Sequence, residues 1–425
     1  MFQSLKLNAR FVYLFIEFTA SMLFSMMFVV VSLYEATVAG LSPFQLVMVG
    51  TTLELAAFVF EVPTGVVADA YSRRASIIIG YLLMGAGFLV EGLFPFFVPI
   101  LLAQVIWGLG YTFTSGATQA WISDEIGEEA ANKLLLRANQ VSLYASLLGM
   151  GLAIVLGGRQ VNLPILLGGA GVMLIGLTLA VIMPETGFHP TPKEDRNTWQ
   201  HMWHIFHEGL TAVRVRPRLI SVLLVGFFYG LYSEGFDRLW VKHLLDTFSI
   251  PVILGSTQVG FFGLMRAGGM VLSILASRFV EQRLDTSSPL AIGRAMLGIT
   301  AALSLSIIGF VLSPLFGLTI GIYVLINMFR NVAGPLYTAW VNQKLDSKTR
   351  ATVLSMSSQV DAIGQIGGGP SVAAIAALSS VVAAITTSGL LLTPALWFIQ
   401  RANGQSQAEA VDALAQTGPD SSLAD

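Results

Sequence analysis

Long apolar stretches alternate with short breaks rich in charge, proline or glycine along almost the whole chain. A helix that crosses a bilayer needs about 20 predominantly apolar residues, and these stretches reach that length. The pattern therefore predicts twelve membrane-spanning helices. They cover roughly residues 11–34, 44–68, 75–97, 98–122, 134–157, 164–183, 218–240, 253–277, 289–312, 315–342, 351–376 and 378–400.

The longest polar break follows the sixth predicted span and divides the chain into two halves. We predict an N-terminal six-helix bundle over residues 1–183 and a cytoplasmic linker over 184–217. A C-terminal six-helix bundle over 218–401 follows, and then a polar tail over 402–425. The composition of the tail, with few bulky apolar residues, predicts disorder.

The linker contains the stretch HMWHIFHEG, with histidines at positions 201, 204 and 207. At about 100° per residue, its tryptophans and other apolar residues share one face of a helix, and His201, His204 and His207 lie beside and opposite that face. This arrangement is typical of an amphipathic helix on a membrane surface. We expect no metal site here.

Lys and Arg are distributed unevenly between the two sides that this topology defines. If the N-terminus is inside, the inner segments hold most of them, including Arg73 and Arg74, and the outer segments hold only Arg159, Arg238 and Lys242. Inner loops of membrane proteins carry the excess of Lys and Arg. The chain is therefore expected to be a multi-pass protein of the cell inner (plasma) membrane with both termini cytoplasmic.

Composition supports a membrane protein and excludes several kinds of chemistry. Hydrophobic residues make up 54% of the 425 residues and charged residues only 11%, whereas soluble domains carry about 25% charged residues. The chain has no Cys, which excludes disulfides and iron–sulfur clusters. A net charge of −2 without a basic stripe gives no reason to expect nucleic acid. No nucleophile–base pair, metal-ligand spacing or phosphate-binding loop is found, so we expect neither an enzyme nor a cofactor.

The two halves of the chain share a weak internal repeat. AWISDE at 120–125 resembles AWVNQK at 339–344, and at the same offset Gln140 corresponds to Gln359 and Gly149 to Gly368. Two related six-helix halves imply a binding site near the middle of the membrane, between them.

The break between the second and third predicted spans has a distinctive sequence, GVVADAYSRR. Its pattern of Gly65, Asp69, Arg73 and Arg74 in a short inner loop resembles the signature loop of the major facilitator superfamily. The surrounding EVPTGVVADAYSRR and the later GYTFTSGATQAW are similar to bacterial drug-efflux members, the drug:proton antiporters.

This resemblance implies an all-α polytopic fold with twelve transmembrane helices in two pseudo-symmetric six-helix bundles. It also implies a conformational latch made by Gly65, Asp69, Arg73 and Arg74. In the family, the Asp caps the N-terminus of the eleventh span, where the helix dipole favours an anion. The Arg pair holds the loop against inner carboxylates and lipid phosphates.

Ionisable residues inside the predicted spans are costly in a bilayer, so each is a functional hypothesis. Glu54, Asp361, Arg266 and Arg330 come out about 16–23 Å from the inner charges at about 1.5 Å per residue, near the middle of the membrane. Arg330 and Asp361 are a natural pair, and Glu54 with Arg266 is a looser one. Such pairs either hold helices together or let a carboxylate exchange its cation for a proton, because burial favours its neutral form and a nearby cation its charged form.

Two sets of candidate residues follow. The proton-coupling candidates, in order, are Glu54, Asp361, Glu17 and Glu61. The resemblance implies that spans one, four, seven and ten line the central cavity. Their polar, aromatic and Met side chains form the candidate substrate surface: Met22, Ser25, Gln104, Trp107, Tyr111, Tyr229, Tyr232, Ser233, Tyr323 and Asn327.

A surface of rings and Met with few hydrogen-bonding groups suits bulky, partly apolar ligands. We therefore expect a monomeric alternating-access transporter that exports amphiphilic, drug-like molecules in exchange for protons, with membrane lipids around it. One alternative is transport of another substrate class, such as a lipid or metabolite, without proton coupling. It stays open because Gln104 stands where proton-coupled drug exporters carry an Arg. A non-transporting receptor or scaffold is the other alternative.

Overall fold

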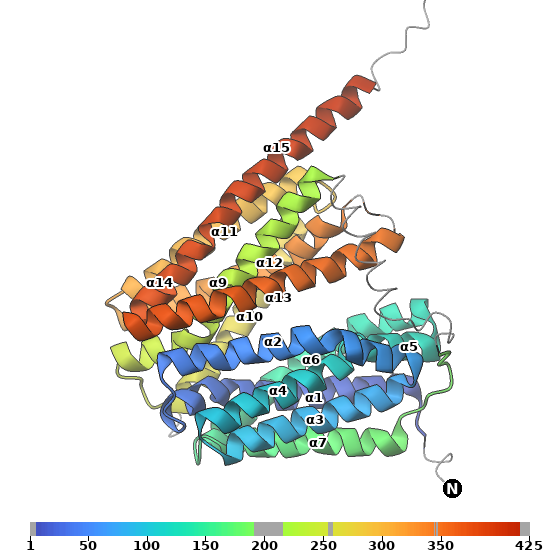
Figure 1. Ribbon diagram of the computed structural model, residues 1–425, viewed down its shortest axis with the longest axis vertical. Helices are drawn as coiled ribbons and strands as arrows, with labels where there is room; N and C mark the ends of the chain where they lie inside the picture. Colours follow the sequence, from blue (N-terminus) through green and yellow to red (C-terminus); the bar gives the residue numbers. More distant parts are fainter. Residues whose placement is uncertain (1–5, 191–215, 254–257, 344, 346, 417–425) are drawn as a thin grey trace, which may run out of the picture. The chain divides into compact units, whose positions relative to one another are not determined.

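The computed structural model describes residues 6–190, 216–253, 258–343, 345 and 347–416. Within these ranges the chain consists of helices and short connections, with no strand (Figure 1). The amphipathic helix expected in the linker lies outside the described residues.

The helices of the first half follow the apolar stretches closely. They are α1 (Ala9–Thr37), α2 (Pro43–Ala70), α3 (Arg73–Leu93), α4 (Phe97–Thr114), α5 (Ala117–Ile126), α6 (Glu128–Gly157) and α7 (Leu163–Ile182). Those of the second half are α9 (Pro217–Thr247), α10 (Gln258–Arg283), α11 (Pro289–Leu312), α12 (Phe316–Asn342), α13 (Ser347–Leu378), α14 (Val381–Leu391) and α15 (Thr393–Gln416).

Two predicted spans are each built from two helices. The fourth span is α4 followed by α5, and the chain turns between them at Gly116, whose φ of 71° lies in the left-handed region. Glycine has no Cβ and adopts this conformation at little cost. The twelfth span is α14 continued by α15, with a break at Leu392.

Eleven segments among the described residues are long and apolar enough to cross a membrane. They account for every predicted span except the eleventh. That predicted span forms helix α13, whose Ser, Gln and Gly content makes it less apolar than the eleven segments.

The tail predicted to be disordered begins at residue 402, but α15 continues as a helix to Gln416. The prediction was therefore wrong for residues 402–416. Their sequence, ANGQSQAEAVDALAQ, is polar but contains five Ala and three Gln, which have high helix propensity.

The chain divides into two compact units. Unit 1 comprises residues 1–201, 237–268 and 369–381, and unit 2 comprises 202–236, 269–368 and 382–425. In unit 1, α3 packs between α4 and α7, and α1 packs against α6 and α7. In unit 2, α11 packs against α12 and α15 (Figure 1).

Glycines allow close helix approach at equivalent places in the two halves. A Cβ on Gly149 of α6 would collide with the carbonyl oxygen of Met22 on α1. A Cβ on Gly368 of α13 would collide with the carbonyl oxygen of Leu231 on α9. Small residues of this kind let helix backbones touch inside a bilayer. The repeat seen in the sequence therefore corresponds to the same packing contact, between spans five and one and between spans eleven and seven.

Candidate functional site

Within the sequence GVVADAYSRR, the loop between α2 and α3 is only two residues long, Tyr71 and Ser72. Helix α2 ends at Ala70, and α3 begins at Arg73 with Ser72 as its N-cap. The Ser72 hydroxyl accepts a hydrogen bond from the backbone N–H of Ala75 at 2.9 Å. An N-cap of this kind satisfies one of the free N–H groups at a helix start. The short connection brings the end of α2, with Asp69, beside the start of α3.

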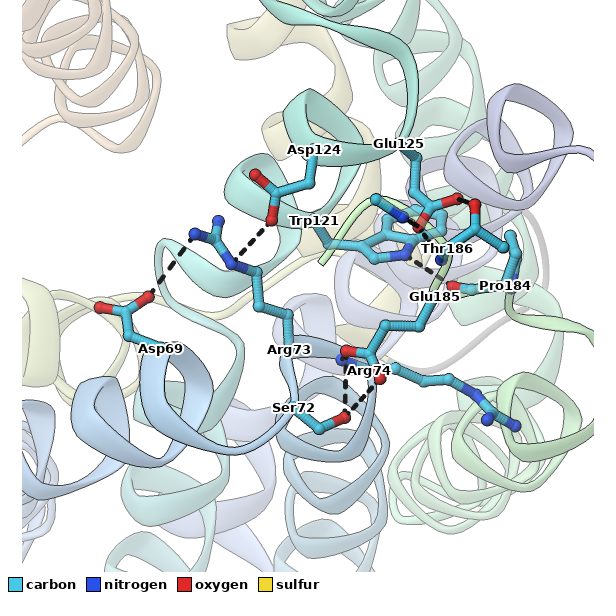
Figure 2. A network of polar contacts seen from close by, with 11 residues as sticks. Asp69, Ser72, Arg73, Arg74, Trp121, Asp124, Glu125, Pro184, Glu185 and Thr186 are labelled. Carbon is cyan, nitrogen blue, oxygen red and sulfur yellow. Dashed lines mark hydrogen bonds and ion pairs between the residues drawn. The ribbon is translucent and has the colours of Figure 1, made fainter. Parts of the chain in front are cut away.

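Arg73 lies between two carboxylates (Figure 2). Its Nε is 3.0 Å from Oδ2 of Asp124 on α5, and its Nη2 is 3.8 Å from Oδ1 of Asp69. The Nε–H is not aimed at the Asp124 oxygen, so the shorter contact is an ion pair rather than a hydrogen bond. Arg73 and Asp124 are 19% and 27% exposed, whereas Asp69 is 62% exposed. The better shielded pair is therefore the one with Asp124.

Glu185 binds the start of α3 from the other side. Its carboxylate accepts hydrogen bonds from the Ser72 hydroxyl at 2.8 and 3.0 Å and from the backbone N–H of Arg74 at 2.9 Å. The Arg74 side chain donates to the carbonyl of Ala180, at the end of α7, at 2.5 Å. A carboxylate at a helix N-terminus is stabilised by the free N–H groups and by the positive end of the dipole.

Helix α5 holds the segment that leaves α7 (Figure 2). Trp121 is 1% exposed and donates from Nε1 to the carbonyl of Pro184 at 2.8 Å. Glu125 accepts hydrogen bonds from the backbone and hydroxyl of Thr186 and from the backbone N–H of Gly187, at 2.5 to 2.8 Å. We call this set of contacts, with those of Arg73, Arg74 and Glu185, the α3–α5 network.

Sequence reasoning identified only part of this network. Asp69, Arg73 and Arg74 were expected to form the latch, whereas Asp124, Glu125 and Glu185 were not expected to take part. A signal for two of them was present, because AWISDE places two carboxylates in an inner segment. A Cβ at Gly65 would meet no atom within 4 Å, so no neighbour requires glycine there in this structure. The latch itself stays a prediction.

The predicted charges in the spans of unit 1 differ in burial, and two of them, Glu54 and Glu61, both act electrostatically on Tyr111. Glu17 accepts a hydrogen bond from the Ser142 hydroxyl on α6 at 3.1 Å. Glu54 is half-buried and Glu61 exposed on α2. The Arg266 guanidinium lies 5.6 Å from the centre of the Trp240 ring, a cation–π distance. The pairing of Glu54 with Arg266 stays a prediction.

The predicted charges of unit 2 influence each other. Asp361 accepts a hydrogen bond from Gln365 Nε2, one turn further along α13, at 2.8 Å. Arg330 on α12 attracts the Asp361 carboxylate electrostatically. The same guanidinium lies 5.9 Å from the centre of the Tyr232 ring. The structure thus brings Arg330, Asp361 and Tyr232 into one neighbourhood.

Aromatic rings gather around the predicted cavity residues of unit 1. The Trp107 ring stacks on Tyr111 at 6.1 Å and makes edge contacts with Phe28 and Phe88 at 6.1 and 5.7 Å. Met22 and Ser25 lie half-buried on α1. Gln104 has a different environment, because it is 6% exposed and its Nε2 donates to Glu91.

The predicted cavity residues of unit 2 are partly held by local hydrogen bonds. The Tyr229 hydroxyl is 2.8 Å from that of Thr300, and its ring contacts that of Tyr232 edge-on at 5.8 Å. Tyr323 is 5% exposed and stacks on Phe236 at 6.5 Å. The side chains of Ser233 and Asn327 donate to backbone carbonyls of their own helices, at 2.9 Å each.

A surface groove of about 380 Å³ lies in unit 2 among α10, α11 and α12. Arg283 and Arg294 border it, and apolar side chains form its walls. It contains none of the predicted cavity residues. Among the described residues, no group of three or more His, Asp or Glu side chains could hold a metal ion.

Two buried carboxylates were missed by sequence reasoning. Glu35 on α1 and Glu91 on α3 are each only 1% exposed. Both interrupt long apolar runs, YEATV and FLVEGLF, and that interruption is the signal that could have identified them.

Comparison with known proteins gives consistent results. The profile of the Major Facilitator Superfamily matches residues 13–369. The MFS-type transporter YxaM of Bacillus subtilis (strain 168), itself uncharacterized, is 26% identical over 333 residues, which are 76% of this chain and 79% of YxaM.

Solved structures of low sequence identity have the same fold. The nucleoside transporter NupG is 14% identical, with a TM-score of 0.69 and coverage of 94% of this chain and 99% of that chain. A POT family transporter in complex with a thioalcohol-conjugated peptide is 12% identical, with a TM-score of 0.69 and coverage of 93% and 96%.

The family match covers most of the chain and agrees with the all-helical architecture. The predicted fold, a polytopic helical membrane protein, is therefore confirmed, and the protein is a membrane transporter rather than an enzyme. The chain belongs to the Major Facilitator Superfamily.

Proposed function

We propose that this transporter exports amphiphilic small molecules across the inner membrane in exchange for protons. The observation that carries the proposal is that ionisable side chains are retained within the predicted membrane spans, with Asp361 held by Gln365 and attracted by Arg330. A charge at such depth costs about 2.5–3.5 kcal/mol even on the lenient insertion scale. A group that is kept at this cost and can exchange a cation for a proton is suited to coupling.

The substrate class is supported by the aromatic side chains. Trp107, Tyr111, Phe28 and Phe88 form a continuous set of rings in unit 1, on the helices that correspond to spans one, three and four. In unit 2, the hydroxyl of Tyr229 and the amide of Asn327 are already hydrogen-bonded within the protein. Rings with few free polar groups favour bulky, partly apolar ligands over highly hydroxylated ones.

The orientation is part of the proposal. The excess of Lys and Arg in the segments on the N-terminal side supports cytoplasmic termini. The α3–α5 network, with Arg73 and Arg74, then lies at the cytoplasmic end of unit 1. As in the family, we assign the latch to Gly65, Asp69, Arg73 and Arg74.

Flux in proteoliposomes tests the function directly. Wild-type protein is reconstituted, and uptake of a fluorescent lipophilic cation, a nucleoside and a dipeptide is measured with and without an imposed pH gradient. We expect accumulation of the lipophilic cation only, driven by the gradient. Accumulation of the nucleoside or dipeptide instead would overturn the substrate class. Flux that ignores the gradient would overturn proton coupling.

Two variants identify the coupling residue. Glu54→Gln and Asp361→Asn each mimic the protonated carboxyl group. The variant at the coupling position should lose gradient-driven accumulation while it keeps substrate binding and passive exchange. Glu129→Gln is the control, since Glu129 is 87% exposed and pairs with Lys133 on the surface. Full gradient-driven accumulation in both variants would exclude both residues as the proton carrier.

A further inference from the structure

A second set of buried polar groups lies in unit 1, away from the α3–α5 network. Glu35 is two residues from the end of α1, and Glu91 is two residues from the end of α3. Both belong to the end of the unit opposite the N-terminus. The Tyr34 hydroxyl donates to the backbone carbonyl of Glu91 at 2.8 Å, and Gln104 Nε2 donates to Glu91 Oε2 at 3.1 Å. Side chains from α1, α3 and α4 thus converge on one point.

One oxygen of each carboxyl group lacks a hydrogen-bond partner. Oε1 of Glu35 and Oε1 of Glu91 are both buried, and no described residue donates to either. Each side chain is only 1% exposed, and the two carboxyl groups act on each other electrostatically. An ionised carboxylate buried without full hydrogen bonding is costly, whereas a protonated one is neutral and gains an O–H donor.

The nearby cation balances only one of these charges. Arg238, in the part of α9 that belongs to unit 1, attracts both carboxyl groups. Tyr34 is another titratable group close to them, and its hydroxyl donates a hydrogen bond to the backbone carbonyl of Glu91. With both carboxylates ionised, the group of Glu35, Glu91 and Arg238 carries a net charge of −1. One bound proton brings it to zero.

The remaining charges on α9 supply no second cation. Glu234 and Asp237 lie within about one turn before Arg238 and are acidic. Lys242, one turn after it, is paired with Asp246 at 2.6 Å. His243, buried on the same helix, has its Nδ1 3.4 Å from the Thr247 hydroxyl. Glu234 is itself buried, at 4% exposure, so it adds a negative charge near Arg238 and leaves Glu35 and Glu91 with at most one cation between them.

We propose that Glu35 and Glu91 form a buried proton-binding site that holds one proton at neutral pH. Binding adds H⁺ to one carboxylate oxygen and creates an O–H group. Release returns H⁺ to water and leaves the net charge of −1 with Arg238. The site deepens the proposed function, because it is a second place where a coupling proton can reside besides Asp361. The existence of the bound proton can be tested without transport.

Infrared difference spectroscopy of the full chain in lipid nanodiscs measures the proton. Wild-type protein at neutral pH should show the C=O stretching band of a buried carboxylic acid, which disappears at alkaline pH. Glu35→Gln and Glu91→Gln should each remove the same band component, because the negative charge of one carboxylate is what keeps the other protonated. The control Glu129→Gln should leave the band unchanged.

Two results would overturn the shared site: a wild type without such a band, or a component that survives one of the two single variants. Arg238→Gln provides a further measurement if either Gln variant accumulates poorly. Without the cation the proton should be held more firmly, so the band should persist to higher pH than in the wild type. A band that disappears at lower pH in Arg238→Gln would contradict the charge balance.

The two proposals fail separately. A protein that shows the band but whose flux ignores a pH gradient retains the proton site and is not an antiporter. A protein with gradient-driven flux but no band is an antiporter that carries its proton elsewhere.

Discussion

Arg73 and Asp124, which are 51 positions apart in the sequence, form an ion pair of 3.0 Å that joins the start of α3 to α5 (Figure 2). The pair is better shielded than that between Arg73 and Asp69. Within unit 1, Asp124 is therefore the principal anchor of Arg73. The Asp69 carboxylate is the more exposed of the two.

Asp124→Asn should lower the free energy of unfolding by about 1–2 kcal/mol. Fully exposed pairs contribute about 0.2–1 kcal/mol, and the shielding of Arg73 and Asp124 places this pair above them. Thermal denaturation in a fixed detergent measures the change. Glu129→Gln removes an exposed pair with Lys133 and should shift stability by less than about 0.5 kcal/mol. Equal losses in the two variants would show that shielding does not matter here.

Asp69→Asn should act on conformation rather than on stability. If Asp69 is part of the latch, its neutralisation should shift the population toward the inward-facing state and slow transport, with expression unchanged. Distances between spin labels at the two mouths of the cavity report the populations. Asp124→Asn is the comparison, because it removes the other partner of Arg73. An unchanged distance distribution with full transport would exclude the latch.

The close helix contacts predict paired effects in the two halves. Gly149→Ala and Gly368→Ala each place a Cβ against a backbone carbonyl and should destabilise by about 1–3 kcal/mol, the usual cost of overpacking. Gly151→Ala and Gly367→Ala are matched controls on the same helices, since a Cβ there meets no atom within 4 Å. The controls should be neutral or slightly stabilising. Thermal melting of the four variants makes the comparison, and tolerance of alanine at 149 and 368 would contradict the contacts.

Arg330 and Asp361 predict a non-additive double mutant. Neutralising either one leaves a charge of opposite sign in the membrane, so Arg330→Gln and Asp361→Asn should each cost about 3–5 kcal/mol. The double variant should recover much of that loss. A double-mutant cycle by thermal denaturation gives the coupling, and additive losses would show that the two charges do not interact. Gln365→Leu removes only the side-chain amide that donates a hydrogen bond to Asp361, so it should lower stability by less than either neutralisation.

The positions of the spans were predictable, because bilayer thickness fixes how long an apolar stretch must be. The turn at Gly116 was not, since it lies inside a stretch that is apolar on both sides. The signal in the sequence is the segment TSGAT, in which Gly116, a residue tolerant of positive φ, stands between the two helices.

The charged residues of functional interest were predictable only in part. Their depth in the membrane was estimated from their distance along the helix to the nearest inner charges. That count identifies Glu54 and Asp361 but gives no weight to Glu35 and Glu91, which lie at the other end of their helices. Partners distant in sequence, such as Asp124 for Arg73 or Glu185 for Ser72, depend on how α5 and the end of α7 pack against α3. A single sequence carries no such information.

Helix α13 is too polar to qualify as a membrane span by composition, although it carries Asp361, Gln365 and the close contact at Gly368. A segment with weak affinity for lipid gains little free energy when it moves by itself from the insertion machinery into the bilayer. Its retention in the bilayer must then depend on neighbouring helices that are already inserted, among them α9, whose backbone Gly368 meets. We therefore expect the second half to assemble in order, with α13 joining partner helices such as α9 rather than partitioning into the membrane by itself.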